Sequence, residues 1–579
     1  MAIENLITEH IDIWTSAVKT RSTSGRGSSK KLELYGVKKL RELILELAVR
    51  GKLVLQDSSD EPACKLLAHK NITQRGLLKL GKGKNLDLDR KISDAEKRYT
   101  LPSGWEWTRL GKILEVTGGS QPPKSKFVYE PREGYVRLVQ IRDFKSDANL
   151  TYVPQEFANR PFDETDIMIG RYGPPVFQIL RGLSGTYNVA LMKAESVGDS
   201  IYGDYLFWLL SEPFIQKLVT SESERTAGQS GVRKELIYDF VIALPPKQEQ
   251  HRIVAKVDEL MALCDQLEQQ TEASIEAHQV LVTTLLDTLT NSADADELMQ
   301  NWARISEHFD TLFTTEESID QLKQTILQLA VMGKLVSQDP NDEPAAELLK
   351  RIAEEKAQLV KEKKIKKQKA LPPISEDEKP FELPSGWEWE RIGTFGVVGT
   401  GATPSRSNPK YWDDPKYNWV SSGETSELFV STTKEKVSEL AIQETNVSIY
   451  PSGTLIVAMY GQGKTRGQIT ELTEPAGTNQ ACAAIQLIEK NESHKDFVKL
   501  YFRKSYEELR SNAAGGAQPN LNVGKVQSTV IAVPPLNEQQ RINTKVNELL
   551  TVCDHLKAHF EAVQNTQLHL TDAIVEQAV

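Results

Sequence analysis

The segment Ala458–Thr465 comes closer to a catalytic motif than any other part of the chain. It reads AMYGQGKT and satisfies a permissive pattern for a phosphate-binding loop, with Lys464 as the phosphate ligand. Such a loop works because a helix begins at its Lys-Thr pair and directs backbone N–H groups at the phosphates. Here Pro475 and Gly477 follow soon, without helical periodicity. The sequence favours a glycine-rich turn between two strands, and a nucleotide hydrolase built on Lys464 is the enzymatic alternative.

Other catalytic chemistries lack the residues they need. The five Pro-Pro pairs follow Gln, Gly, Leu, Leu and Val, whereas an amino-group methyltransferase needs Asp or Asn there. The nine histidines are scattered without metal-ligand spacing. The cysteines include no C-x-x-C pair and are expected to be small buried residues; they are Cys64, Cys264, Cys482 and Cys553. We therefore expect no catalytic centre, cofactor or metal in this chain.

Basic, amide and aromatic side chains gather in two stretches, 108–243 and 390–532. Arg, Gln and Asn can make paired hydrogen bonds to base edges, and Lys and hydroxyl groups contact phosphates. As a set, these residues favour reading of double-stranded DNA. The candidates in the first stretch are Lys124, Lys126, Arg132, Arg137, Gln140, Arg142, Arg171, Tyr172, Gln178, Arg181 and Asn188. Those in the second are Arg406, Lys410, Trp412, Tyr460, Gln462, Lys464, Arg466, Asn479 and Gln480.

The overall composition restricts how DNA could be bound. The 579 residues include 70 basic and 80 acidic side chains, giving a net charge of -10, so positive charge must be concentrated locally. Mean hydropathy is -0.41, and apolar stretches such as Leu455–Met459 are strand-sized. We expect no membrane segment, no secretory signal and a cytoplasmic protein of several domains. The lysine-rich run Lys361–Lys369 favours a solvated helix end over a DNA contact, and a charge-rich linker follows it.

The elements that position these stretches are duplicated. The segment Leu43–Leu67 returns as Thr325–Leu349, identical at 17 of 25 positions and 282 residues later. LPSGWEW at Leu101 recurs unchanged at Leu383, and Leu244–Leu267 returns as Val533–Leu556 with 13 of 24 positions identical. The intervening stretches have diverged. The second copy is complete only if the carboxy terminus continues into the amino terminus, which predicts a pseudo-two-fold, circular duplication with neighbouring termini.

A long helix is predicted after each of the Pro-Pro pairs at 245 and 534. Proline fits a helix start but not its interior, and about 40 residues of helix span about 60 Å. We expect the two helices to pack as an antiparallel coiled-coil spacer; two unrelated amphipathic helices are the alternative. The apolar positions are Ile253, Val257, Leu260, Cys264, Leu267, Ile275, Val282, Leu285 and Leu289, and then Ile542, Val546, Leu549, Cys553, Leu556, Phe560 and Val563.

The two diverged stretches read as α+β domains. Strand-like segments are Gly134–Phe144, Asp166–Tyr172, Thr186–Ala194, Gly453–Tyr460 and Gln480–Ile488. Helices are expected over Asp204–Val219 and Lys495–Ser511. The fold class is therefore α+β, with two such domains joined by two long antiparallel helices. An adaptor without DNA binding is the structural alternative.

Taken together, the repeated motifs resemble the specificity subunit of type I restriction-modification enzymes, in its longer form. They are the LPSGWEW repeats, Gly228–Ile237, Gly516–Val526 and the two PP-x-x-EQ-x-RI helix starts. The resemblance implies target recognition domains over 101–245 and 383–533. It also implies an N-terminal helical region over 1–100, a central region with a spacer helix over 246–382, and a C-terminal spacer helix over 534–579.

The resemblance also implies a function and a set of partners. Each target recognition domain would read one half of a bipartite DNA sequence. Because the two domains differ in sequence, we expect the site to be asymmetric, and a spacer of about 60 Å or less would place the half-sites roughly one helical turn apart. Two methyltransferase subunits and the restriction subunits would dock on the chain. Those partners would hold S-adenosylmethionine, ATP and magnesium, and the chain itself would be non-catalytic. Because its charge is negative, we expect the isolated chain to bind DNA weakly.

Overall fold

A computed structural model describes residues 3–22, 30–73, 75–79, 85–173, 175–224, 231–293, 295–460, 465–506 and 521–579. The chain divides into two compact units. The first is built mainly from Ser28–Ala273 and Gln564–Val579, together with the N-terminal helices, and the second from Ser274–Val563. Helix α10 (Lys247–Thr290) begins in the first unit and ends in the second, whereas α20 (Leu536–Ala578) begins in the second and ends in the first.

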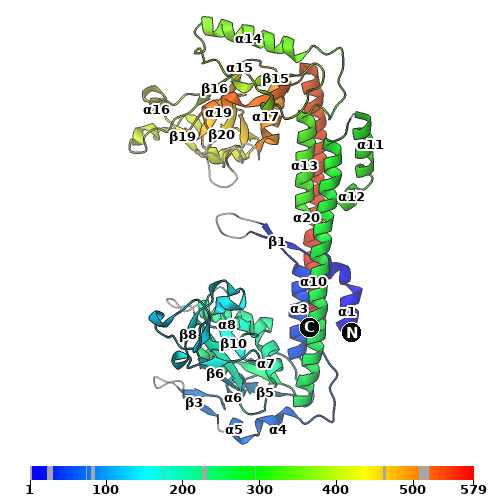
Figure 1. Ribbon diagram of the computed structural model, residues 1–579, viewed down its shortest axis with the longest axis vertical. Coiled ribbons are helices and arrows are strands. Elements are labelled where there is room, and N and C mark those ends of the chain that lie inside the picture. Colours follow the sequence, from blue (N-terminus) through cyan, green and yellow to red (C-terminus); the bar gives the residue numbers. More distant parts are fainter. Residues whose placement is uncertain are drawn as a thin grey trace. The chain divides into compact units, whose positions relative to one another are not determined.

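In the first unit, α3 (Tyr35–Val49) packs with the start of α10 and the end of α20 (Figure 1). The Arg41 guanidinium donates to Asp265 of α10 at 2.6 Å, and the Tyr35 hydroxyl donates to Asp572 of α20 at 2.8 Å. The ammonium of Lys52 donates to the Val579 carbonyl at 2.6 Å. The last residues of the chain thus complete the helical scaffold of the first unit, as the circular duplication requires.

In the second unit, α13 (Glu316–Val331) takes the place of α3 and packs with the end of α10 and the start of α20 (Figure 1). Lys323 pairs with Asp554 of α20 at 2.7 Å, and a ring nitrogen of His278 on α10 lies 2.9 Å from the Leu312 carbonyl. Helix α14 (Ala345–Lys361) follows α13.

The predicted long helices are confirmed, with 44 residues in α10 and 43 in α20. The five predicted core positions from Ile253 to Leu267 are all buried, which confirms the heptad-like spacing. Val563 is 39% exposed, so its predicted place in the apolar stripe is wrong. Cys64 is also exposed, contrary to prediction, while the other three cysteines are buried and all four are free.

The structure adds a further pair of duplicated helices that the sequence repeats do not predict. Helices α1 (Ile3–Glu9) and α2 (Ile11–Ser16) correspond to α11 (Ala295–Ser306) and α12 (Phe309–Leu312). The residues before α2 and α12 are His10, with φ -121° and ψ 24°, and His308, with φ -120° and ψ 20°. The shared letters E-H-x-D are too few to stand out by themselves.

The first copy contains an additional hairpin between α2 and α3. The histidines before α2 and α12 are 298 residues apart, whereas Leu40 and Leu322 are 282 apart, so the first copy is 16 residues longer. Strands β1 (Lys19–Ser22) and β2 (Lys30–Glu33) occupy this insertion and pair antiparallel, with Lys19 opposite Glu33. The Gly36 amide donates to the Ala17 carbonyl at 2.9 Å, which brings the two ends of the insertion together.

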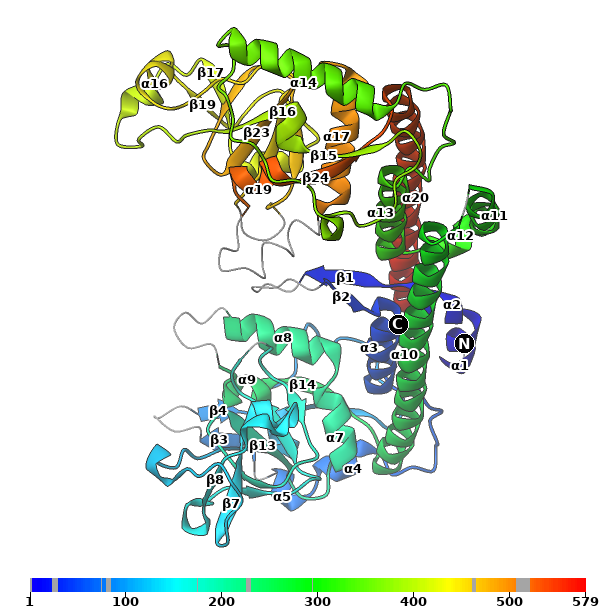
Figure 2. The same ribbon diagram turned by 45° about the horizontal axis from the view of Figure 1, so that its top comes forward.

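The diverged stretch of the first unit forms two small sheets and a two-stranded pair. Figure 2 shows α7 (Gly203–Leu210) between these sheets and α3. The sheet orders are β11-β10-β13-β6, β8-β7-β12-β9 and β14-β5. Their strands are β5 (Glu106–Arg109), β6 (Leu114–Gly118), β7 (Tyr135–Val139), β8 (Tyr152–Pro154), β9 (Pro161–Phe162), β10 (Ile167–Gly170), β11 (Ile179–Leu180), β12 (Gly185–Tyr187), β13 (Leu191–Ser196) and β14 (Val241–Leu244). Short helices α4 (Ala63–Leu67), α5 (Lys70–Thr73), α6 (Leu110–Ile113), α8 (Pro213–Glu224) and α9 (Lys234–Asp239), and strands β3 (Leu77–Lys79) and β4 (Asn85–Asp87), complete the unit.

The second unit repeats this plan with different loops. Its sheet orders are β16-β23-β20-β21-β18, β19-β17-β22 and β15-β24. The strands are β15 (Glu388–Arg391), β16 (Gly396–Thr400), β17 (Tyr417–Val420), β18 (Phe429–Val430), β19 (Glu435–Val437), β20 (Leu455–Ala458), β21 (Ile469–Leu472), β22 (Ala476–Thr478), β23 (Cys482–Leu487) and β24 (Val530–Val533). The helices are α15 (Ile392–Phe395), α16 (Glu439–Glu444), α17 (Glu492–Lys504) and α19 (Val523–Ser528). Buried Glu471 on β21 pairs with Lys495 at 2.7 Å and with Lys499 at 3.0 Å, both on α17.

The α+β class of the two stretches is confirmed, but three predicted elements are divided. The strand predicted over Gly134–Phe144 ends at Val139, because Gln140 and Asp143 form a capping box that starts a 3-10 helix. The strand predicted over Thr186–Ala194 is split by a turn at Asn188. The helix predicted over Asp204–Val219 is broken before Pro213, because proline lacks the amide donor that a helix interior needs.

Candidate nucleic-acid interface

Each diverged stretch is attached to its long helix by the same buried junction. In the first unit, the Trp105 indole N–H donates to Glu249 Oε2 at 2.9 Å, and the Gln56 amide donates to Oε1 at 3.1 Å. In the second unit, Trp387 donates to Glu538 Oε2 at 3.0 Å, and Gln338 donates to Oε1 at 2.9 Å. Both glutamates are 1% exposed. The repeated LPSGWEW motif therefore supplies the tryptophan that fixes the helix start.

Glycine is required where the scaffold meets the tryptophan. Gly51 has a φ of 66° and Gly333 a φ of 68°, in the left-handed region that favours glycine. A Cβ atom on Gly51 would lie 2.9 Å from the Trp105 ring, and one on Gly333 would lie 2.8 Å from the Trp387 ring. The repeated R/M-G-K-L-V sequence after α3 and α13 thus follows from close packing against the indole.

Charged groups on the two junctions also match. Arg252 pairs with Asp60 at 2.6 Å, and Arg541 pairs with Asp342 at 2.7 Å. Burial raises the pKa of Glu249 above its usual value, and the same cause raises the pKa of Glu538. Each long helix therefore begins with a buried carboxylate whose hydrogen-bond partners come from the scaffold.

A second repeated contact, an arginine–glutamate clamp, lies at the base of each stretch. The buried Arg109 guanidinium donates to Glu96 at 2.8 Å, and Arg391 donates to Glu378 at 2.8 Å. The pKa of Glu96 is lowered to about 2, chiefly by the Ser93 backbone N–H. The pKa of Glu378 is lowered to about 2, chiefly by Arg391. The charge-rich linker before the second stretch is therefore ordered, because it supplies the glutamate of this clamp. The Ser-x-x-Glu spacing, which both copies share, is the sequence signal that could have indicated it.

The two stretches share a core behind their loops. In the first, strand β12 pairs parallel with β7 and is followed by Asn188, whose backbone N–H donates to the Val139 carbonyl at 3.2 Å. In the second, Asn479 follows β22 and donates in the same way to Val420 at 3.0 Å. Both side-chain oxygens accept from the backbone N–H two residues ahead, at 3.0 Å. These two candidate DNA contacts therefore use their carbonyl oxygens to form a turn.

Several other candidates have partners inside their own unit. Arg137 pairs with Asp147 at 2.7 Å, and Arg181 pairs with Asp204 at 2.7 Å. Arg406 donates to both oxygens of Glu435 at 2.6 and 2.8 Å. The sequence could not show these pairs, because the partners come from neighbouring loops and strands.

The environment of the remaining candidates varies. Arg406 also lies over the Trp412 ring at 3.8 Å, Arg171 lies over Tyr172, Gln178 donates to the Pro175 carbonyl, and Gln480 accepts from Thr403. Gln140 is the cap residue named above, and Arg466 is half-buried. Exposed candidates are Lys124, Lys126, Arg132, Arg142, Lys410 and Tyr460. Gln462 and Lys464 lie outside the described residues, as do parts of the Gly228–Ile237 and Gly516–Val526 motifs.

The motif around Lys464 connects two antiparallel strands, as the preferred interpretation predicts. The Gly467 amide donates to the Ala458 carbonyl at 2.9 Å, and strand β21 begins at Ile469. Strand β20 pairs with β21, so a strand rather than a helix follows this loop. The described residues contain no cluster of three or more potential metal ligands. Within the same residues, no helix is long and apolar enough to cross a bilayer.

The comparisons with known proteins agree with the position of the junctions. A family model described as the type I restriction modification DNA specificity domain matches residues 102–277 and 384–561, each match starting within an LPSGWEW motif. The EcoEI and EcoAI type I restriction enzyme specificity subunits of Escherichia coli are 42% and 41% identical over all of both chains. The chain belongs to the family of type I restriction enzyme specificity subunits. The resemblance carried by the repeated motifs is thereby confirmed.

Membership defines the chain as a specificity subunit, a non-catalytic recognition component of a type I restriction system. A solved chain from work on "complex assembly and conformational transition of the type I R-M system" shares the fold, with a TM-score of 0.51 at 18% identity. That match covers 83% of this chain and 98% of the other.

Proposed function

We propose that the two diverged stretches are target recognition domains, each reading one half of a bipartite and asymmetric DNA sequence. The observation that supports this proposal is the identical junction at two stretches whose exposed loops differ. An unchanged attachment with changed loops fits two modules that perform the same task on different sequences. The helices α10 and α20 would act as an antiparallel spacer between them.

The same helices would dock two methyltransferase subunits and the restriction subunits. In this proposal the methyltransferase subunits hold S-adenosylmethionine and the restriction subunits use ATP and magnesium. The candidate base-contacting surface comprises the exposed arginines, lysines and aromatic residues of both stretches. Phosphate contacts from the partners would supply much of the affinity, because this chain has a net charge of -10.

The proposal is tested by co-expression with methyltransferase subunits and selection of bound duplexes from a random pool. Two fixed half-sites flanking an unspecified spacer are the expected result. A stable complex without any enriched sequence would contradict it and would leave an adaptor function.

A domain exchange gives the sharper test. Replacing residues 108–243 with a second copy of 390–532 gives a chain with two identical modules. Because the symmetry of a DNA site mirrors the symmetry of the protein that binds it, the selected site should become an inverted repeat of one original half-site. Retention of the original asymmetric site would refute the assignment of one half-site to each stretch.

A further inference from the structure

Exposed lysines follow helix α14 in the second unit. The run Lys361–Lys369 contains six lysines and one glutamate, and all six lysines are exposed. Lys364 pairs with Glu362 at 2.9 Å. Within the described part of the chain, no ion pair neutralises Lys366, Lys367 or Lys369. Three charged groups within four consecutive positions of the chain therefore remain available to a ligand.

The path of this segment is fixed on both sides of the lysines. The Ile365 side chain packs on the core of the second unit, and a Cβ atom added to Gly393 would touch Leu371 at 2.8 Å. The Arg391 guanidinium donates to the Pro372 carbonyl at 2.9 Å. The lysines are consequently presented from an anchored backbone, which lowers the entropic cost of holding them around a ligand.

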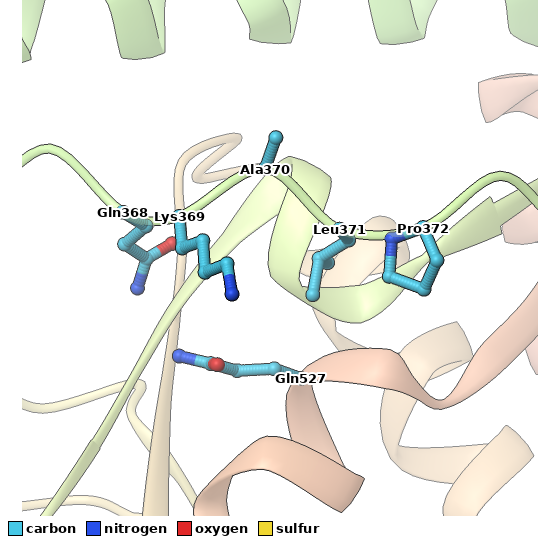
Figure 3. Close-up of a pocket in the computed structure, with 6 residues that line it drawn as sticks. All are labelled: Gln368, Lys369, Ala370, Leu371, Pro372 and Gln527. Carbon is cyan, nitrogen blue, oxygen red and sulfur yellow. The ribbon is translucent and has the colours of Figure 1, made fainter.

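The same segment borders a hollow of about 620 Å³, lined by Gln368, Lys369, Ala370, Leu371, Pro372 and Gln527. Figure 3 shows Lys369 and Gln527 pointing into it from opposite sides. Its polar lining side-chain groups are one ammonium and two amides, with no carboxylate among the lining residues. The Gln527 amide also donates to the Val398 carbonyl at 3.4 Å, which leaves one of its two N–H bonds for a ligand. Such a set of hydrogen-bond donors suits an anion.

A neighbouring lysine orients one of these amides. Lys356 donates to Gln368 Oε1 at 3.2 Å and to the Gly393 carbonyl at 2.6 Å. Because the Gln368 oxygen faces Lys356, its NH₂ group is left to donate elsewhere. The contact thus makes Gln368 a donor toward the hollow rather than an acceptor.

We propose that Lys366, Lys367 and Lys369, together with the amides of Gln368 and Gln527, bind phosphate groups of the DNA backbone. This inference rests on the proposed function, because the DNA would be the duplex that the target recognition domains read. Lysine ammonium groups contact phosphates without reading bases, so the site adds affinity but no sequence preference. The surface would be a specific part of this chain that offsets its negative total charge.

The test measures the salt dependence of binding by the full chain co-purified with its methyltransferase subunits. Fluorescence anisotropy with a duplex carrying the selected site gives the affinity at several salt concentrations. Each lost phosphate contact lowers the slope of log affinity against log salt by about 0.9, so K366Q/K367Q/K369Q should lower it by roughly 2.7 if all three contact phosphates. Specific and non-specific duplexes should weaken by the same factor.

A second variant separates phosphate binding from folding. Gln368→Glu places a carboxylate beside Lys356, which can pair with it, so the local fold is retained while an anion is repelled. This variant should weaken DNA binding without lowering the Tm. If the Tm stays constant and affinity is unchanged, the hollow is not a phosphate site.

The matched control is K350Q/K490Q/K545Q, which removes the same charge from lysines that have partners in the second unit. Those partners are Glu347 at 3.8 Å, the Leu487 carbonyl at 3.0 Å and Glu548 at 3.3 Å. The control should retain the wild-type slope. Equal slopes for both triple variants would overturn the inference, as would weaker assembly with methyltransferase subunits at an unchanged slope, which would indicate an acidic protein partner.

The two proposals fail in different ways. A wild-type complex that selects no sequence refutes the proposed function, whereas the lysine variants can still be compared on a non-specific duplex. A complex that selects two half-sites but shows no change of slope in the lysine variants refutes only the phosphate site.

Discussion

Glu249→Ala tests whether the tryptophan–glutamate junction holds the first diverged stretch to its helix. The substitution removes the acceptor of the Trp105 indole N–H, which lies in a side chain only 5% exposed. Gln56 keeps its hydrogen bond to the Gly51 carbonyl at 2.7 Å, so one buried donor loses its partner. An unsatisfied buried donor costs about 1–3 kcal/mol, which sets the expected destabilisation at about 2 kcal/mol.

The expected loss is measurable by scanning calorimetry. At about 2.1 cal/mol/K of unfolding entropy per residue, a loss of about 2 kcal/mol in a unit of this size, which comprises Met1–Ser24, Ser28–Ala273 and Gln564–Val579, should lower its Tm by about 3 °C. Native-state hydrogen exchange locates the effect, because amides of the β5–β14 pair should exchange faster while those of β15–β24 do not. Glu538→Ala should give the reverse pattern and a similar magnitude, because the Trp387 contact has nearly the same length.

A double-mutant cycle isolates the contact itself. Trp105→Phe removes the donor and keeps most of the packing, so Glu249→Ala should cost less in that background. Residues that share a hydrogen bond typically show coupling energies of roughly 0.5–3 kcal/mol. Strict additivity, or equal exchange effects in both strand pairs, would refute the junction as the element that fixes each helix start.

Three further predictions concern stability. Glu96 and Glu378 have pKa values lowered to about 2 in the folded protein, so the two carboxylates stabilise it above pH 4.5. This contribution is lost as the pH falls toward 2. The double variant E96Q/E378Q should therefore show a flatter dependence of Tm on pH between 4.5 and 2. Deletion of residues 18–33 should leave a folded first unit with an unchanged Tm, because the second copy lacks this insertion; loss of the cooperative transition would contradict that. Glu471→Ala leaves the buried Lys499 ammonium without its ion-pair partner, whereas Lys495 keeps its pair with Glu492. The variant should cost the second unit about 3–5 kcal/mol in chemical denaturation, and no change there would show that water reaches the Lys499 ammonium.

The repeated blocks made the scaffold predictable, because a constant spacing of identical residues indicates identical backbone surroundings. Both long helices and most of their predicted apolar positions are confirmed, with Val563 as an exception. The turn at Asn188 could not be predicted in the same way. Its side-chain oxygen competes for a backbone N–H inside a run that otherwise has strand composition.

The candidate site was less accessible to sequence reasoning than the scaffold. Residue types identify possible donors to DNA, but they do not show which donors are already occupied. Arg406 lies in the loop after β16 and Glu435 lies at the start of β19, so the two residues are 29 positions apart in sequence and meet only in the fold. In contrast, the lysines of residues 361–369 belong to a run that favoured a solvated helix end, and the hollow beside them emerged only from the fold.

The junction contacts explain why a diverged stretch could change in sequence without disturbing its attachment to the long helix. Trp105 and Glu249 both lie outside residues 108–243, so an exchange of that stretch retains both partners of the buried hydrogen bond. Arg109 lies inside the stretch, but the incoming Arg391 occupies the equivalent strand position and can reach Glu96. The exchanged chain should therefore keep the tryptophan–glutamate junction and the arginine–glutamate clamp at each stretch. A change in DNA preference could then be assigned to the loops rather than to a loosened scaffold.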